Sequence, residues 1–183
     1  MSNSSITKQA LANSIKELML EKPLSKINVG DIVKRCNLSR KSFYYHFKDK
    51  YDLVNWIFYT EFVSKFQNGT DILGWELLED ICNFFYENKV FYRNALEVRG
   101  QNSFYDYFGE VLSTIIELHF KNVFENHQNS SFYVVFFTDA IRTSITRWLL
   151  EGAKIPPKEY VELMKSTVTG VAVQIIKEME EKQ

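Results

Sequence analysis

Residues 28–47 read NVGDIVKRCNLSRKSFYYHF, a pattern typical of two short helices joined by a tight turn. Asn28 can cap the first helix, whose apolar residues recur at spacings of three and four. Asn37 tolerates the left-handed conformation that a tight turn needs, and Ser39 can cap the second helix. This spacing predicts a helix-turn-helix, in which the start of the second helix enters the major groove of DNA.

The second helix, expected over residues 40–47, has two chemically different faces. Phe43 and Phe47 lie four residues apart and therefore share the face that packs inward. The other face carries cationic, hydroxyl and aromatic side chains, which suit base edges and phosphates. The candidate DNA-contacting residues, including the flanking ones, are Asn28, Val29, Ser39, Arg40, Lys41, Ser42, Tyr44, Tyr45, His46, Lys48 and Lys50.

The charge distribution is uneven along the chain. Residues 1–51 hold ten Lys and Arg against four Asp and Glu, a net charge of +6, whereas the rest carries −7 within a total of −1. A basic first third suits a protein that meets a polyanion with one end, because each cation at a phosphate releases condensed counterions. A basic solvated surface is the alternative interpretation of the charge alone.

The rest of the chain is expected to be helical, because Gly (7) and Pro (3) are scarce and aromatic residues make up 15%. We predict an all-α protein with a helix-turn-helix DNA-binding domain over 1–49 and a helical regulatory and dimerisation domain over 50–183. Of the 28 aromatic residues, 23 follow position 51. The expected further helices are 5–21 before Pro23, 50–67 after an Asp49 cap, 72–88, 90–98, 104–126 after a Ser103 cap, 131–151 and 158–182.

Residues 27–53 resemble the DNA-binding region of the TetR family of regulators. In that family a turn ending in Ser leads into a short recognition helix that ends Tyr-x-His-Phe, followed by a Lys and a Leu. The residues in those places are Tyr44, His46, Phe47, Lys50 and Leu53. The resemblance implies two groups: Arg40, Lys41, Tyr44 and Tyr45 as readers of base or sugar edges, and Ser42, His46 and Lys50 as phosphate ligands.

Two positions depart from the family pattern. Asn37 stands where the turn usually has Gly, and Gly30 near the start of the first helix costs about 1 kcal/mol of helix propensity. Beyond the motif, residues 56–58, 86–92 and 147–152 are similar to the branch that includes regulators of dihydroxyacetone-kinase operons. That similarity concerns scattered positions and implies no particular ligand.

The last two predicted helices have broad apolar faces, which favours a two-fold homodimer interface built as a four-helix bundle. The candidate interface residues are Tyr133, Phe137, Ile141, Ser144, Trp148, Tyr160, Met164, Thr167, Val168 and Val171. Core packing should take most other aromatic residues, but a body of this size can also enclose a ligand pocket. The candidate pocket residues are Trp56, Tyr59, Tyr86, Tyr92, Tyr105 and Arg142.

We therefore expect a sequence-specific transcription regulator that binds a palindromic operator. A small-molecule effector or partner protein at the C-terminal domain would change operator affinity by moving the fourth helix. Repression is the commoner outcome that the resemblance implies, with activation as the alternative. A helical interaction module that only keeps the shape of a helix-turn-helix is the rival hypothesis.

Other function classes find little support. Three dispersed His residues, without a G-x-S-x-G motif, a phosphate-binding Gly loop or metal-ligand spacing, argue against an enzyme and against a metal or cofactor. Cys36 and Cys82 lie far apart, which indicates neither a disulfide framework nor zinc. No apolar stretch is long enough to span a membrane, and the N-terminus has no secretory signal, so we expect a cytoplasmic protein without a membrane partner.

Overall fold

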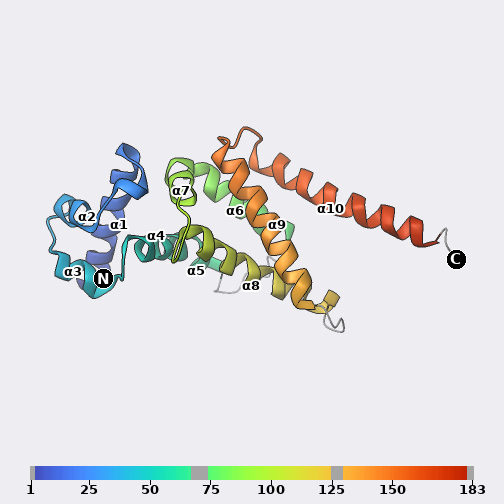
Figure 1. Cartoon of the computed structure of the whole chain (residues 1–183), viewed down its shortest axis with the longest axis horizontal. Helices are drawn as coiled ribbons and strands as arrows, with labels where there is room; N and C mark the ends of the chain where they lie inside the picture. Colours follow the sequence, from blue (N-terminus) through green and yellow to red (C-terminus); the bar gives the residue numbers. More distant parts are fainter. Residues whose placement is uncertain (1–2, 67–73, 125–129, 181–183) are drawn as a thin grey trace.

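The structure is a computed structural model that describes the backbone of residues 3–66, 74–124 and 130–180 and the side chains of 4–65, 74–118 and 130–170. It confirms the all-α prediction, since no residue of these ranges lies in a strand. The molecule is elongated: α3 lies at one end and the C-terminal end of α10 at the other (Figure 1).

The N-terminal elements form around the predicted caps. They are α1 (Asn3–Glu21), the short 3-10 turn η1 (Leu24–Lys26), α2 (Val29–Arg35) and α3 (Arg40–His46). Asn28 accepts a hydrogen bond from the Asp31 amide and donates its own amide to the Asp31 carboxylate, both at 3.1 Å, which completes a capping box. Asn37 adopts φ 54°, and Ser39 caps α3 by accepting from the Ser42 amide at 3.1 Å.

The first three helices hold α3 by its apolar side. Phe43 is fully buried and Phe47 is 3% exposed, as their spacing predicted. They pack into one core with Leu11 and Ile15 of α1, both fully buried. Because this side of α3 is fixed, its opposite side is presented to solvent in a defined orientation.

The fourth helix differs from the prediction. It consists of α4 (Lys50–Phe58), the π turn η2 (Tyr59–Val63) and α5 (Ser64–Phe66), whereas a single regular helix was predicted over 50–67; residue 67 lies outside the described residues. Asp49 caps α4 as expected, accepting from the Tyr51 and Asp52 amides at 2.8 Å. The wider π turn accompanies the stacking of Phe58 on Phe62, with ring centroids 5.4 Å apart, against the aromatic core of the second domain.

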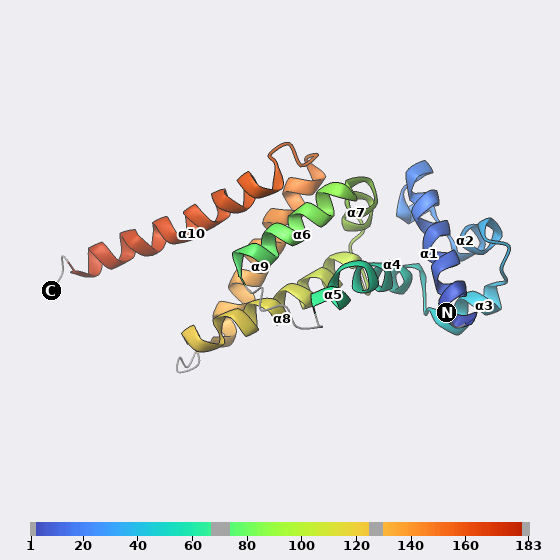
Figure 2. The ribbon, with the colours of Figure 1, turned by 180° about the vertical axis from the view of Figure 1, so that it is seen from behind.

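The C-terminal domain packs its helices around aromatic side chains. Its elements are α6 (Trp75–Glu87), α7 (Lys89–Leu96), α8 (Phe104–Phe124), α9 (Ser130–Leu150) and α10 (Pro157–Glu180). The core is centred on Phe58, Phe85, Tyr92, Phe104 and Phe108, each at most 1% exposed. α8 packs against α9, and the first part of α10 packs against α6, while the rest of α10 projects away from the body (Figure 2).

The two parts of the chain share one continuous core, which runs from α1 through α4 into the second set of helices. The boundary between residues 49 and 50 therefore stays a prediction, because α4 packs on both sides of it. Among the described helices, none is both long and apolar enough to cross a membrane.

Candidate nucleic-acid interface

The outward side of α3 carries the residues that the sequence singled out. Arg40 and Lys41 on its first turn are exposed, and Tyr44 and Tyr45 are 58% and 82% exposed. These aromatic side chains stay in solvent although the chain has a large aromatic core. Because α3 lies at the free end of the molecule (Figure 1), the C-terminal helices do not cover it.

Gly30 explains how Arg40 lies on this surface. A Cβ at position 30 would come within 2.9 Å of Arg40 Nη2 and within 2.9 Å of the Asn28 side-chain oxygen. The guanidinium therefore lies across the first turn of α2, in space that only a glycine leaves open. The glycine that looked like a departure from good helix propensity is the residue that accommodates Arg40.

Several cations of the N-terminal domain are neutralised within the protein. Lys22 pairs with Asp31 at 2.8 Å, and Arg35 pairs with Glu21 at 2.7 Å. The hydrogen bond from Lys22 is the largest cause of the lowered pKa of Asp31, and the hydrogen bond from Arg35 has the same role for Glu21. These basic residues stabilise the joint between α1 and α2.

The cations of α3 and the segment after it are different. Within the described part of the chain, Arg40, Lys41 and Lys48 form no ion pair with a carboxylate. Lys48 is exposed, and its backbone amide donates to the Asp52 carboxylate at 2.9 Å. The unpaired positive charge of the domain therefore includes these side chains beside α3, where a polyanion would meet them.

Lys50, which we expect to hold a phosphate, has its ammonium against the backbone of its own domain. Its ammonium donates to the backbone oxygens of Leu24 at 2.7 Å and Ile27 at 2.6 Å, with that of Ser25 at 3.4 Å. Burial lowers the pKa of Lys50, while the charges of Asp49 and Asp31 oppose this. Because an ammonium has three hydrogen-bond donors, Lys50 ties α4 to the turn between α1 and α2, and its donors are engaged there.

The remaining candidates are partly engaged in the local fold. The side chains of Asn28 and Ser39 accept from amides of the helices that they cap. Val29 is half-buried and packs against the core. Ser42 and His46 are half-buried, and the His46 ring lies edge-on to Tyr45 with centroids 4.8 Å apart.

The six predicted pocket residues do not converge on one cavity. Tyr92 is buried in the aromatic core, and Trp56 packs against Phe47 at a centroid distance of 5.6 Å. The other four lie at three places: Tyr59 is partly exposed in η2, Tyr86 stacks on Trp148, and Tyr105 lies under the guanidinium of Arg142. Most aromatic residues of the described part pack in the core. The sequence alone does not distinguish a core aromatic residue from one that lines a pocket.

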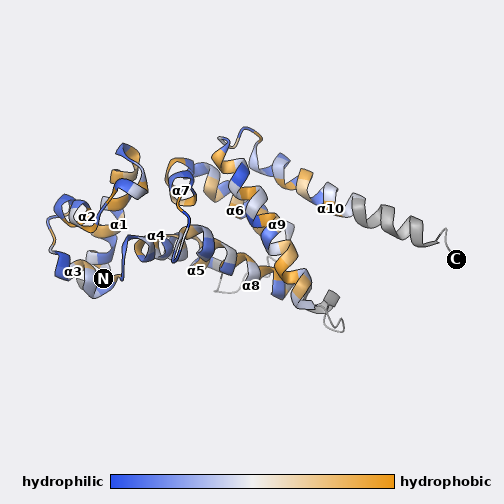
Figure 3. Cartoon of the chain, in the orientation of Figure 1, coloured by the Kyte–Doolittle hydropathy of each residue, from blue (hydrophilic) through white to orange (hydrophobic). Residues whose placement is uncertain are grey.

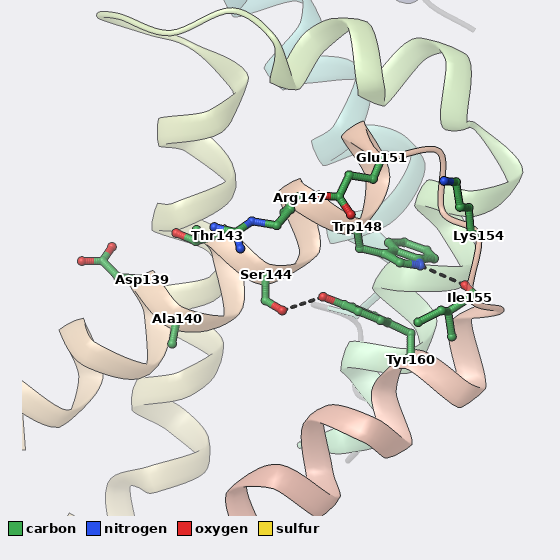
Figure 4. A pocket seen from close by; sticks show the side chains of 10 residues that line it. All are labelled: Asp139, Ala140, Thr143, Ser144, Arg147, Trp148, Glu151, Lys154, Ile155 and Tyr160. Atoms are coloured by element: carbon green, nitrogen blue, oxygen red, sulfur yellow. Dashed lines mark hydrogen bonds between the residues drawn. The ribbon is translucent and has the colours of Figure 1, made fainter.

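Two hollows lie elsewhere in the C-terminal domain. A groove of about 630 Å³ lies between α9 and the start of α10 (Figure 4). Its floor holds the Ser144 to Tyr160 hydrogen bond at 2.5 Å and the bond from the Trp148 indole to the Ile155 oxygen at 2.9 Å. A cavity of about 180 Å³ lies among α6, α8, α9 and α10, with a largely apolar lining that includes Leu78, Ile115 and Phe137.

Among the residues of α9 that we expect in the dimer interface, Trp148 is buried in its own domain, and the other four are half-buried: Tyr133, Phe137, Ile141 and Ser144. Trp148 is 5% exposed and stacks on Tyr160 at 5.0 Å, and Phe137 and Ile141 line the smaller cavity. The exposed apolar residues lie on the neighbouring stripe, and Figure 3 shows the hydrophobic colouring of this half of α9. They are Phe132, Val135 and Phe136, at 64%, 58% and 56% exposure.

The predicted interface residues that are exposed lie on α10. Thr167 and Val168 are exposed, Met164, Tyr133 and Ser144 are half-buried, and the side chain of Val171 lies outside the described residues. Both faces of α9 are apolar, so the sequence alone could not tell which one the home domain covers. Over the described ranges, no group of three or more His, Cys, Asp or Glu residues is arranged to hold a metal ion.

Family models match both parts of the chain. Residues 11–57 match the model for bacterial regulatory proteins of the tetR family, and residues 75–170 match a transcriptional regulator C-terminal region of the same family series. These models describe regulators of transcription and no catalytic activity.

A curated relative and two solved structures are similar to this chain. The HTH-type dhaKLM operon transcriptional activator DhaS of Lactococcus lactis subsp. lactis (strain IL1403) is 31% identical over 100 residues, covering 54% of this chain and 53% of DhaS. The match thus spans about half of that relative. The solved dihydroxyacetone kinase operon activator DhaS has a TM-score of 0.67 at 20% identity, covering 92% of this chain and 97% of that one. A TetR transcriptional regulator from Streptococcus agalactiae 2603V has a TM-score of 0.69 at 22% identity, covering 90% and 94%.

Proposed function

Because this chain belongs to the TetR family and is a bacterial DNA-binding transcriptional regulator, we propose that a homodimer of it binds a palindromic operator. One α3 from each copy enters the major groove, with the half-sites about one helical turn or more apart. The observation that carries this proposal is the outward side of α3, where Arg40 and Lys41 are exposed and form no ion pair with a described carboxylate, while Phe43 is fully buried.

The candidate DNA-contacting side chains of α3 and its flanking residues have different roles in this proposal. Arg40 and Lys41 on the first turn reach guanine edges, and Tyr44 and Tyr45 contact thymine methyl groups or sugars. Ser42, His46 and Lys48 hold phosphates. Asn28, Val29 and Ser39 lie near the DNA backbone. Their main role is to fix the starts of α2 and α3. Lys50 acts from inside the domain, because its ammonium is held by backbone oxygens.

The dimer forms through the exposed stripe of α9 and the projecting part of α10. Phe132, Val135 and Phe136 supply apolar area that water would otherwise cover, and Val168 adds to it from α10. The groove of Figure 4 shares Ala140 and Thr143 with this side of α9, so a second copy covers the groove as well. A four-helix arrangement of two α9 and two α10 helices satisfies both surfaces.

Operator affinity changes when an effector or a partner protein binds the C-terminal domain. The smaller cavity favours an uncharged ligand of modest size, because its lining is largely apolar. A coupling of about 1 to 3 kcal/mol changes occupancy about 5- to 150-fold. Repression follows where the operator overlaps a promoter. Activation follows where the operator lies upstream of the promoter, and activation is the activity that the name of the curated relative states. The site of action is the bacterial cytoplasm, where the DNA lies.

Selection of genomic DNA fragments by the purified protein tests this function. The expected result is enrichment of a two-fold symmetric sequence, with binding that weakens steeply as salt is raised. Mapping the enriched site against promoters then gives the sign of regulation. Retention of fragments without sequence preference, or no retention at low salt, would favour the interaction module over the regulator.

A further inference from the structure

One residue of the regulatory domain holds the end of α1 by three hydrogen bonds. Asn94 lies in α7, and its side-chain oxygen accepts from the Leu24 amide at 2.6 Å. Its side-chain nitrogen donates to the backbone oxygens of Met19 at 3.1 Å and Lys22 at 3.3 Å. Figure 2 shows α7 beside this end of α1. The α7 amide therefore caps a helix of the DNA-binding domain.

The backbone at this point needs such a group. The last carbonyls of an α-helix have no partner within the helix, and Met19 belongs to the last turn of α1. The turn η1 begins after Pro23 without a side-chain cap of its own. A carboxamide supplies a donor and an acceptor in one plane, so Asn94 satisfies both the end of α1 and the start of η1.

The same turn is held from its other side by α4. Leu24 is 1% exposed, and its amide is taken by Asn94 while its carbonyl oxygen is taken by Lys50 at 2.7 Å. Lys50 also binds the Ile27 oxygen, directly before the Asn28 cap of α2. Helices α4 and α7 of the regulatory domain therefore both form hydrogen bonds with the short segment that connects α1 to the helix-turn-helix.

We propose that Asn94 is a positioning residue that fixes the orientation of the helix-turn-helix relative to the regulatory domain. A displacement of α7 is then passed through the Leu24 backbone and η1 to α2 and α3, in addition to any movement of α4. The proposal rests on the proposed function, since orientation matters only if two copies of α3 must match two half-sites. In a dimer, a fixed orientation sets the separation of the recognition helices.

The test measures the preference for half-site spacing. An operator selected from random duplexes by the wild-type dimer is remade with one base pair inserted or deleted between its half-sites. Affinities of the wild-type protein, Asn94→Ala and Asn94→Asp are then compared over this series. Asn94→Asp keeps the size of the side chain but places an oxygen against the Met19 and Lys22 carbonyls. Asn83→Ala, at an exposed asparagine of helix α6, is the matched control.

The expected result is a flattened preference: both Asn94 variants lose about 5- to 20-fold at the best spacing and change less than about twofold at the altered spacings. Asn83→Ala keeps the wild-type ratio. A loss that is equal at every spacing, or an unchanged ratio in both folded Asn94 variants, would overturn the proposal. If the wild-type protein selects no operator at all, the proposed function itself fails, which is a separate result.

Discussion

The guanidinium of Arg40 lies over Gly30, so close that a Cβ there would come within 2.9 Å of Nη2. Arg40 starts α3, and Gly30 lies in the first turn of α2. The contact places the guanidinium beside the starts of both helices, where their free amides favour anions. We assign Arg40 to base reading. The position of its side chain therefore depends on the absence of a Cβ at Gly30 in α2.

Replacing Gly30→Ala should displace Arg40 and reduce operator affinity by about tenfold. Ala favours the helix by about 1 kcal/mol relative to Gly, and the crowded Arg40 atoms belong to a flexible side chain. The new Cβ also lies 2.9 Å from the Asn28 oxygen that caps α2, so urea unfolding of the variant is measured beside its affinity. Fluorescence anisotropy with a labelled operator measures the affinity. Asn83→Ala, at an exposed position of helix α6, is the control. Unchanged affinity of Gly30→Ala would show that Arg40 does not need this place.

Two nearby lysines should give opposite results. Lys48→Ala should lower the salt dependence of operator binding by about one charge for each half-site, because Lys48 is exposed and we propose that its ammonium contacts phosphate. Lys50→Ala should instead lower the free energy of unfolding by about 1 to 3 kcal/mol, since two backbone oxygens lose a charged partner. Salt titrations of binding and urea unfolding measure the two effects. A reduced salt dependence in Lys50→Ala without loss of stability would show that Lys50 is one of the residues that contact phosphate.

The N-terminal domain should lose stability in acid. Asp31 and Glu21 have lowered pKa values in the folded protein, through hydrogen bonds from Lys22 and Arg35. A carboxyl group whose pKa is lower when folded stabilises the fold above its unfolded pKa, and this stabilisation is lost as the pH falls through the folded pKa. The melting temperature should therefore decrease from about pH 5 to about pH 3.

The double variant Asp31→Asn with Glu21→Gln should show a smaller decrease over the same pH range. Glu159→Gln, at an exposed carboxyl at the start of α10, should follow the wild-type curve. Thermal melts followed by circular dichroism give both curves. If the double variant and the wild-type protein lose the same stability, these two ion pairs do not govern the acid response.

A charge on the exposed stripe of α9 should break the dimer. Phe136→Asp places a carboxylate where we expect apolar contact with a second copy, and a buried unpaired charge is strongly unfavourable. Sedimentation equilibrium should show monomers at concentrations where the wild-type protein is dimeric. Val90→Asp on α7 is a matched control, because Val90 is 52% exposed and Phe136 is 56% exposed. Dimers in both variants would place the interface elsewhere.

Local rules explain why much of the helix-turn-helix could be predicted. The caps at Asn28, Ser39 and Asp49 and the left-handed Asn37 each depend on neighbours within a few residues. The inward side of α3 follows from the spacing of its two phenylalanines. Such signals are complete within the sequence segment, so the structure confirms them.

Contacts between distant segments explain the differences. The donors of Lys50 are engaged 23 to 26 residues earlier in the chain, and nothing beside Lys50 in the sequence indicates this. The π turn at Tyr59–Val63 accompanies aromatic packing against another helix, where Phe62 contacts Phe84 of α6 at a centroid distance of 5.0 Å. One sequence feature indicates a role for Asn94: it is a polar amide beside Tyr92 and Ala95, which are buried in α7. We made no prediction from this feature.

Base preference in the Arg40→Ala variant tests the DNA-reading role of α3 most directly. Random duplexes are selected in parallel by the wild-type protein and by Arg40→Ala, and the enriched sequences are compared position by position. We predict a palindrome for the wild-type protein and loss of preference at one position in each half-site for the variant, with the other positions kept. An unchanged preference in Arg40→Ala, or an equal loss at every position, would contradict the assignment of α3 as the element that reads the operator.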